Sequence, residues 1–520
     1  MSPSTPSLLR LSLLSQLLIF SSPIWAANPF VQYANDFIDP GYIAGLNGKY
    51  PASLKSAQNT IVAWAEELNS HGPWSVTFKP VVAPSNDKHD YMSWAPYQWP
   101  DCSSVKNTTV LTPAEIRTTC PYVNRDGQVN PDRSIPNDFQ SFFNVSDAVL
   151  YNSLASTFQA GSAGKYQANA VKYIKTWFLD EATAMNPNLK YAQMRLGPTG
   201  QLGTFTGILD LRMMAKVVSG VLILRETKAA AWTQDIDSAF VKWCKAYINW
   251  LQTAPTAQEA RDAKNNHGTF FAGQFMALQV LVGDNDGAAK TGRAYFDGEF
   301  KNQIAADGDQ PLEATRTHPY HYRGFNIAGM ITAARLLKYA DPSSNVWQTS
   351  SLAPGATIQK AVDFFMSTDP AKSGETDVTY EIYPNVAAVA ATYGDADGKY
   401  IDFLKKSGFP YAGDAFFLWD QPLGVRTGSG VSSAAVSRSS LPSHSAPQPS
   451  SSATSSTGPR PPATGSGNSV GSSGQGGAPA DNTSPNNNAG GAPGRSASGR
   501  SASSMLGLWV GVVGAVIGLL

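Results

Sequence analysis

The sequence predicts an all-α fold: an α/α toroid, which is an incomplete barrel of helical hairpins, in a single large domain over residues 27–425. Two observations predict it. Apolar residues recur at three- and four-residue steps in window after window, which is the spacing of one face of a helix. Alternating strand-like runs are scarce, and no linker rich in Pro, Gly and Ser interrupts this span. Because packed helices hold their connecting loops in place, we expect the chemistry in the long loops.

The helical pattern recurs in six windows along this domain. Four of them show an apolar stripe on one face, at residues 54–68, 170–178, 240–251 and 358–365. Two others are mostly apolar and small, as expected for helices packed on both sides, at residues 208–224 and 327–339. The segment 88–138 is the loop-rich exception.

Both ends of the chain indicate processing and surface attachment. Residues 1–26 are typical of a secretory signal peptide, because a lone cation precedes an apolar run too short to span a bilayer. Residues 426–490 are almost all small or polar, so we expect a disordered, O-glycosylated stalk. Residues 491–520 match a GPI-attachment signal that is removed, with a single tail-anchored helix as the alternative. We therefore expect a secreted protein at the cell surface, held to the plasma membrane or cell wall by a GPI anchor.

The cysteines and sequons agree with an oxidising, secretory route. Cys102 and Cys120 are the candidate disulfide, closing a loop rich in aromatic residues and proline. Cys244 lies in a helical pattern and is expected to be a buried thiol. The sequons at Asn107 and Asn144 would be exposed to glycosylation in this compartment, as would a third at Asn482.

The charge balance bears on the class of partner. The formal net charge is zero, from 39 Lys and Arg against 39 Asp and Glu. This excludes a bulk electrostatic attraction to nucleic acid, although a local basic groove can still bind an acidic polysaccharide. We expect a monomer with such a polymer as its partner, no cofactor, and membrane contact only through the GPI anchor.

The stretch Asn265-Asn266-His267 precedes a helix that we expect over residues 269–282. A helix N-terminus offers free backbone N–H groups and the positive end of a dipole. Amide and imidazole groups at that place are suited to clasping a carboxylate. The structural alternative is that Asn265 or Asn266 caps the helix and His267 fills a polar pocket.

A second stretch runs from Arg316 to Tyr322, ahead of a helix expected to start near Asn326. Arginine can hold a carboxylate through two hydrogen bonds. A tyrosine whose pKa is lowered beside that cation can act as a base and then return the proton. The structural alternative for Arg316 is an ion pair with Glu313.

Together these groups suit removal of the C5 proton of a uronic acid within a polysaccharide. Charge builds on the carboxylate as that proton leaves, so donors aimed at the carboxylate supply the largest stabilisation. A neutral His or Tyr moves the protons. H5 and O4 lie on the same side in D-mannuronate and D-glucuronate, so one tyrosine can serve both steps. The candidates for this chemistry are Asn265 or Asn266, His267, Arg316 and Tyr322.

Aromatic side chains in the loop-rich segment offer a surface on which sugar rings stack. Tyr97 and Trp99 are candidates for such contact, with packing onto the helices as the alternative, whereas we expect Trp94 to pack. His318 and His321 lie three residues apart, which raises a metal site as an alternative. No HExxH pattern or cysteine pair nearby completes one, so we expect no metal.

Several short motifs follow one another in a defined order. They are Lys88-His89-Asp90-Tyr91, Ala95-Pro96-Tyr97-Gln98-Trp99-Pro100, Arg125-Asp126-Gly127 with Asn130-Pro131, Met185-Asn186-Pro187-Asn188 with Tyr191-Ala192-Gln193, Asn265-Asn266-His267-Gly268-Thr269, and Gln310-Pro311-Leu312-Glu313 with Arg316-Thr317 and His321-Tyr322. In this order they resemble the alginate lyase domain family over about residues 80–345.

The resemblance implies an α/α toroid and a polysaccharide lyase that acts by β-elimination on a uronate polymer, either alginate (polymannuronate) or glucuronan. In such lyases Asn, His and Arg neutralise the carboxylate, and Tyr is the acid and often the base. Carried over, these are Asn266 or Asn265, His267, Arg316 and Tyr322. The residues expected to bind substrate are Asn265, Tyr97, Trp99, Gln193, His321 and Arg125.

Two rival functions remain open at the level of sequence. An α/α-toroid glycoside hydrolase acting on acidic glycans would need two positioned carboxylates. Asp307, Asp309 and Glu313 are available, but their clustering on one loop argues against opposite faces of a sugar. A non-catalytic cell-wall glycan-binding protein would bind such polymers without turnover.

Overall fold

The computed structural model describes residues 37–106, 110–421 and 423. They belong to one compact unit, Met1–Ser433, and a second unit, Ala434–Leu520, lies wholly outside the described residues. The expected signal peptide, stalk and GPI signal also fall outside them, as do the sequons at Asn107 and Asn482.

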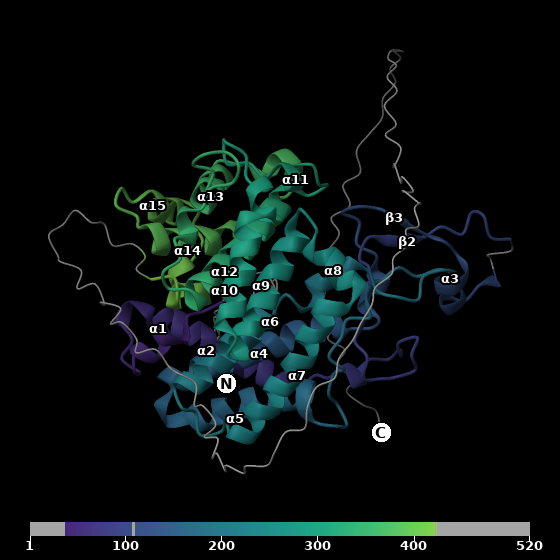
Figure 1. Cartoon of the computed structure of the whole chain (residues 1–520), viewed down its shortest axis with the longest axis horizontal. Helices are drawn as coiled ribbons and strands as arrows, with labels where there is room; N and C mark the ends of the chain where they lie inside the picture. Colours follow the sequence, from purple (N-terminus) through teal and green to yellow (C-terminus); the bar gives the residue numbers. More distant parts are fainter. Residues whose placement is uncertain (1–36, 107–109, 422, 424–520) are drawn as a thin grey trace, which may run out of the picture. The chain divides into compact units, whose positions relative to one another are not determined.

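Helices form nearly all of the regular structure of the described residues and are arranged as an α/α toroid, which confirms the predicted all-α class (Figure 1). The first half contains α1 (Pro40–Gly45), α2 (Lys55–His71), α3 (Pro113–Thr119), α4 (Asp138–Phe158), α5 (Ala163–Ile174), α6 (Met214–Glu226) and α7 (Gln234–Thr253). The second half contains α8 (Pro255–Arg261), α9 (Asn266–Leu281), α10 (Asn285–Asp297), α11 (Pro311–Ala314), α12 (Pro319–Ala340), α13 (Ile358–Met366), α14 (Tyr383–Tyr393) and α15 (Lys399–Lys406).

Two kinds of helix build the toroid. Helices α4, α6, α9 and α12 are buried along most of their length and pack against one another, α9 against both α6 and α12. Helices α2 and α7 bury one face only, as their striped sequences predict. Gly329 of α12 permits a close approach to α9, because a Cβ there would meet the Thr269 side chain at 3.0 Å.

Three of the six predicted windows, 54–68, 240–251 and 358–365, correspond to α2, α7 and α13, and the other three differ in their boundaries. Window 170–178 ends as helix α5 at Ile174 and continues as one π turn, Lys175–Leu179. Window 208–224 divides into a 3-10 turn, Phe205–Leu211, and α6. The buried Asp210 lies in the turn, where its carboxylate accepts a hydrogen bond from Gln193.

The helix expected near Asn326 begins seven residues earlier, at Pro319, so His321 and Tyr322 lie in its first turn. Proline at the first position is compatible with this start, since its fixed φ suits a helix and it has no N–H to satisfy. The helix expected over residues 269–282 begins at Asn266 and has Asn265 as its N-cap.

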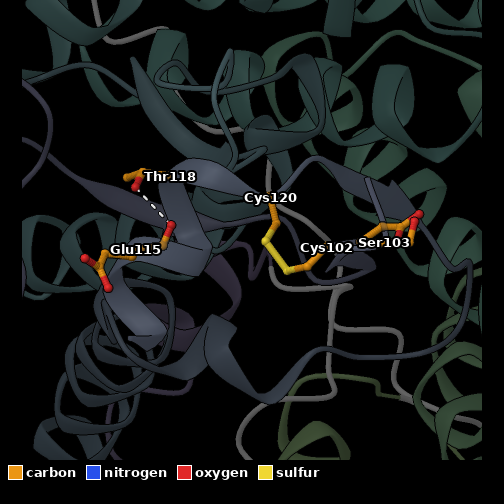
Figure 2. Close-up of a disulfide and its surroundings, with 6 residues drawn as sticks. Cys102, Ser103, Glu115, Thr118 and Cys120 are labelled. Carbon is orange, nitrogen blue, oxygen red and sulfur yellow. Dashed lines mark hydrogen bonds between the residues drawn. A yellow bond between two sulfur atoms is a disulfide. The ribbon is translucent and has the colours of Figure 1, made fainter. Parts of the chain in front are cut away.

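The loop-rich segment contains short strands. Strand β1 (Met92–Trp94) pairs in parallel with β4 (Tyr191–Met194), and β2 (Gln98–Pro100) pairs antiparallel with β3 (Tyr122–Asn124). Residues 98–124, from β2 through α3 to β3, are named the disulfide arm, because Cys102 and Cys120 are bonded to each other within it at an S–S distance of 2.03 Å (Figure 2). Trp94 is buried in a small core, as expected for packing.

The sequon at Asn144 is not placed as expected. Asn144 lies within α4 and is half-buried, and the Ser146 side chain of the same sequon is fully buried and donates to the Phe143 carbonyl. Helix α4 packs against α2, α5 and α6, which limits access to this acceptor, and glycosylation of Asn144 stays a prediction. Cys244 is a buried free thiol. In the part of the chain that the structure describes, we find no helix with the length and hydropathy of a membrane span.

Candidate active site

The predicted catalytic residues come from the starts of two neighbouring helices, α9 and α12. Asn266 and His267 open α9, Arg316 lies in the loop before α12, and Tyr322 lies in its first turn. The guanidinium of Arg316 lies 3.8 Å from the centre of the Tyr322 ring, and its charge also acts on His267. The Tyr322 hydroxyl is 2.8 Å from the hydroxyl of Tyr97, which precedes the disulfide arm.

The hydrogen bonds of Asn265 determine which nitrogen of His267 carries the proton. Asn265 Oδ1 accepts the backbone N–H of His267 at 3.3 Å, as a helix cap does, and lies 2.9 Å from His267 Nδ1. An atom that accepts a backbone N–H is the amide oxygen, so Nδ1 must be the donor in the second contact. In the neutral ring, Nε2 therefore keeps its lone pair and is available to receive a proton.

His267 is neutral at ordinary pH. Burial lowers the pKa of this imidazole from its ordinary value of 6.5 to about 4, and the nearby charge of Arg316 acts in the same direction. The ring of Phe205 lies against it, with centroids 5.2 Å apart. A neutral ring with a free Nε2 is the form that a general base requires.

Asn266 is held by a buried carboxylate. Glu313 accepts the backbone N–H of Asn266 at 2.9 Å and its side-chain Nδ2 at 2.8 Å, and both residues are almost fully buried. Burial raises the pKa of Glu313, while its two bonds to Asn266 act to lower it. Asn265 thus serves as the helix cap and as the hydrogen-bond partner of His267, whereas Asn266 is held in place by its two hydrogen bonds to Glu313.

Both helix starts are already occupied by groups of the protein. Glu313 and Asn265 take the first two N–H groups of α9, and Glu375 takes those of Tyr320 and His321 in α12, at 2.9 and 3.0 Å. The backbone N–H groups that a helix N-terminus usually offers are therefore already satisfied by these caps. A substrate carboxylate must be met by side chains.

Tyr322 differs from expectation in its acidity. Burial raises the pKa of the Tyr322 phenol well above its ordinary value, and the hydrogen bond with Tyr97 adds to the rise. The Arg316 charge opposes this but is outweighed, so the predicted lowering beside the cation is wrong. At neutral pH the phenol keeps its proton, which suits a proton donor.

Arg316 pairs with Asp126 and not with Glu313. The Nη2 to Oδ1 distance is 2.9 Å, and Thr317 donates its hydroxyl to the same carboxylate at 2.8 Å. Burial alone would raise the pKa of Asp126, but these bonds bring it below its ordinary value. Because Asp126 faces Nε and Nη2 of the guanidinium, a substrate carboxylate would meet the Nη1 side.

His321 faces a different environment from His267. Its Nδ1 lies 3.0 and 2.8 Å from the two oxygens of Glu381, and its ring stacks on Phe325 with centroids 5.6 Å apart. Burial alone lowers the pKa of His321, but the charge and hydrogen bond of Glu381 outweigh it and raise the pKa above its ordinary value.

The side chains of the other residues expected to bind substrate have partners outside this group. Arg125 is exposed and stands over the ring of Trp99, 5.4 Å from its centre, and the Trp99 indole donates to a backbone carbonyl. Gln193 is buried and donates to Asp210 at 2.8 Å. Its φ of +47°, unusual for a residue with a side chain, is held by this buried network.

Sequence reasoning missed the roles of four acidic residues that hold the site, namely Asp126, Glu313, Glu375 and Glu381. Asp126 and Glu313 lie in motifs that carry the resemblance, but nothing local indicates their partners. His318, the other candidate ligand of the metal alternative, lies 3.2 Å from the Gly127 carbonyl. Within residues 37–106, 110–421 and 423 we find no cluster of three or more metal-binding side chains.

Comparison with known proteins identifies the family. The family model described as alginate lyase matches residues 75–372, which is more than half of the chain. The crystal structure of an alginate lyase from Bacteroides ovatus superposes with a TM-score of 0.64 at 26% identity, covering 75% of this chain and 99% of that one.

A variant of alginate lyase A1-III complexed with a tetrasaccharide aligns over 76% of this chain and 98% of that one, but its TM-score of 0.43 and 13% identity support no argument. No curated protein sequence matches the chain. Family and fold are those of a polysaccharide lyase, and the chain belongs to the alginate lyase family.

Proposed function

We propose that this protein cleaves a uronate polymer, alginate (polymannuronate) or glucuronan, by β-elimination. The observation that carries the proposal is the pair of proton-handling groups at the site. A neutral His267 with a free Nε2 stands near Arg316, and Arg316 covers a protonated Tyr322. Two titratable groups whose environments push their pKa values apart are the usual sign of a base and an acid in one site.

The first step is removal of the C5 proton. Arg316 neutralises the carboxylate through its Nη1 side, and the second N–H of Asn266 Nδ2, beside the one bonded to Glu313, donates a hydrogen bond to it, so that negative charge can build there as an aci-anion. His267 Nε2 takes the C5 proton and becomes an imidazolium. A cation forms at His267 as an anion forms on the sugar, so net charge does not build up within the site.

The second step breaks the C4–O4 bond. The electron pair of the aci-anion forms the C4–C5 double bond, and the bond to O4 breaks with its electrons on oxygen. Tyr322 donates its proton to that oxygen, and Arg316, stacked on the ring, stabilises the phenolate that remains. Proton transfer from His267 to Tyr322 through solvent restores both groups. The products are a chain with a free hydroxyl and one that ends in an unsaturated uronate.

The direct test is a panel of uronate polymers and neutral polysaccharides, followed by the ultraviolet absorbance of the unsaturated product. We expect absorbance to grow with polymannuronate or glucuronan and not with neutral polymers. Reducing ends without absorbance would mean hydrolysis, and binding without either signal would mean a glycan-binding protein. Either result would overturn the proposal.

A deuterium-exchange experiment identifies the base. In heavy water, Tyr322→Phe should retain C5 proton exchange in the polymer while losing cleavage, because His267 still removes the proton. His267→Gln should lose both. If Tyr322→Phe abolished exchange while His267→Gln retained it, Tyr322 would be the base and the division of roles proposed here would be wrong.

A further inference from the structure

Acidic residues surround the start of α12, although the proposed substrate is itself an anion. Asp126 is compensated by Arg316 and Thr317, and Glu375 by two backbone N–H groups at the positive end of α12. Glu381 remains, and among the described residues the side chain that the structure bonds to its carboxylate is His321. What Glu381 does therefore depends on the state of this imidazole.

The geometry of Glu381 is that of a buried partner. It lies in the 3-10 turn Thr376–Ile382, and its side chain is 7% exposed, against 32% for that of His321. Both carboxylate oxygens lie within hydrogen-bonding distance of Nδ1. Glu375, next to the same turn, holds the backbone N–H of His321. The segment from Glu375 to Glu381 therefore binds both the backbone N–H and the ring of His321.

This arrangement requires a proton on Nδ1 and favours a second one on Nε2. A carboxylate accepts hydrogen bonds only, so the nitrogen that faces Glu381 must be a donor. A buried carboxylate without a cation is costly, and an imidazolium removes that cost. Glu381, Glu375 and Glu313 all favour a charged ring, while Arg212 opposes it. The His321 side chain is 32% exposed, so we take Nε2, the ring nitrogen that does not face Glu381, as the group that meets the substrate.

The site needs such a second cation. The positive charge of Arg316 is already offset by Asp126 before any substrate arrives. The His321 ring lies beside that of Tyr322, with centroids 5.0 Å apart, so its charge acts where the carboxylate must lie if Tyr322 is to reach O4. With a neutral His321, the uncompensated Glu381 would repel an anionic sugar.

We propose that Glu381 is a positioning residue, which holds His321 as an imidazolium with its Nε2–H available to the substrate carboxylate. This inference rests on the proposed function and deepens it, because it names the group by which the site selects anionic over neutral sugars. Glu381 lies outside the stretch that the family model matches, residues 75–372.

The first experiment does not depend on activity. The full chain, labelled at histidine, is titrated by nuclear magnetic resonance, and the His321 signals are assigned from their loss in His321→Gln. We expect Glu381→Gln to lower the titration midpoint of His321 by about one to three pH units, because it keeps an acceptor of similar shape and removes the charge. An unchanged midpoint would overturn the proposal.

The second experiment measures kcat and KM on the polymer cleaved by the unmodified protein, from about pH 5 to about pH 8. Glu381→Gln should approach the unmodified protein at the acid end, where His321 is protonated in both. At the alkaline end it should fall about tenfold or more in kcat/KM, mainly through KM. A loss that is equal at every pH would mean a merely structural role and would contradict the proposal.

Two matched variants complete the test. Glu375→Gln alters a buried carboxylate of the same segment that bonds backbone instead of the ring and acts on His321 only through its charge, so we expect a loss that grows with pH much less than that of Glu381→Gln. In a His321→Gln background, Glu381→Gln should have no further pH-dependent effect. A full effect in that background would overturn the proposal. If no polymer is cleaved at all, the proposed function fails, and the magnetic resonance titration still decides the role of Glu381.

Discussion

The starts of α9 and α12 place the same residue type in opposite states. His267 faces an amide oxygen and the ring of Phe205, and its pKa is lowered to about 4. His321 faces the Glu381 carboxylate, and its pKa is raised. The two helices pack against each other, so one site holds an imidazole with a lowered pKa and one with a raised pKa. The difference teaches that the partner of Nδ1, and not the residue type, decides what each histidine can do.

The two helix starts also differ in how they satisfy their backbone. In α9 a neighbouring residue, Asn265, supplies part of the cap, whereas in α12 the cap comes from Glu375, 55 residues beyond Tyr320. The first kind of cap is visible in sequence, while the second exists only after folding. Four changes can break or sharpen this comparison.

The largest effect is expected from Tyr322→Phe, which removes the proton donor of the α12 start. Cleavage should fall about 10²- to 10⁴-fold, the usual contribution of a general acid, with the melting temperature little changed. Tyr97→Phe is the matched control, since it removes one hydrogen bond to Tyr322 and should cost no more than about tenfold. Near-full turnover in Tyr322→Phe would show that the acid lies elsewhere.

Arg316→Ala comes next, because it removes the cation that faces both helix starts. Cleavage should fall about 10²- to 10³-fold, as for loss of one transition-state donor. Asp126→Asn keeps hydrogen-bonding atoms beside Arg316 and should cost about tenfold or less. The comparison is made in kcat/KM on one polymer. Equal losses in the two variants would mean that the ion pair, and not the free side of the guanidinium, is what catalysis needs.

The neutral state of His267 predicts how the free energy of unfolding should change with pH. Between its ordinary pKa of 6.5 and its folded value of about 4, the unfolded chain binds a proton that the folded chain excludes. Stability is therefore lost at this residue as pH falls through that window. Between about pH 7 and about pH 4, the free energy of unfolding of His267→Gln should fall by less than that of the unmodified protein. The difference should be on the order of 3 kcal/mol, as measured by urea unfolding. Identical pH dependence in both proteins would contradict the burial of a neutral ring.

Two substitutions of Asn265 give the smallest expected change in stability. One of them also makes the start of α9 resemble the start of α12. Asn265→Ala removes the cap and should cost about 1 kcal/mol in urea unfolding. Asn265→Asp keeps the cap but puts a carboxylate beside Nδ1 of His267, as Glu381 is beside that of His321. The pKa of His267 should then rise, and cleavage should weaken at mildly acid pH. An unchanged His267 titration would mean that burial and the charge of Arg316, and not the partner of Nδ1, control the pKa of this residue.

Much of this molecule followed from its sequence. The all-α class, the windows that became α2, α7 and α13, and the meeting of two motifs some fifty residues apart were all predicted from periodicity and residue type. The start of α12 was missed, because His318 makes no side-chain cap and Pro319, which suits a first helical position, was the one local signal. The half-buried position of Asn144 could not be predicted, because the sequon pattern does not show that α4 packs against three other helices.

The sequence by itself determined the helical class and the side chains available for proton transfer, because both follow from local spacing and chemistry. Only the tertiary structure decided which of them are charged. It paired Arg316 with Asp126 across 190 residues, Asn266 with Glu313 across 47, and His321 with Glu381 across 60. A pKa depends on burial and on charges within a few ångströms, and those neighbours are brought together only when the helices pack.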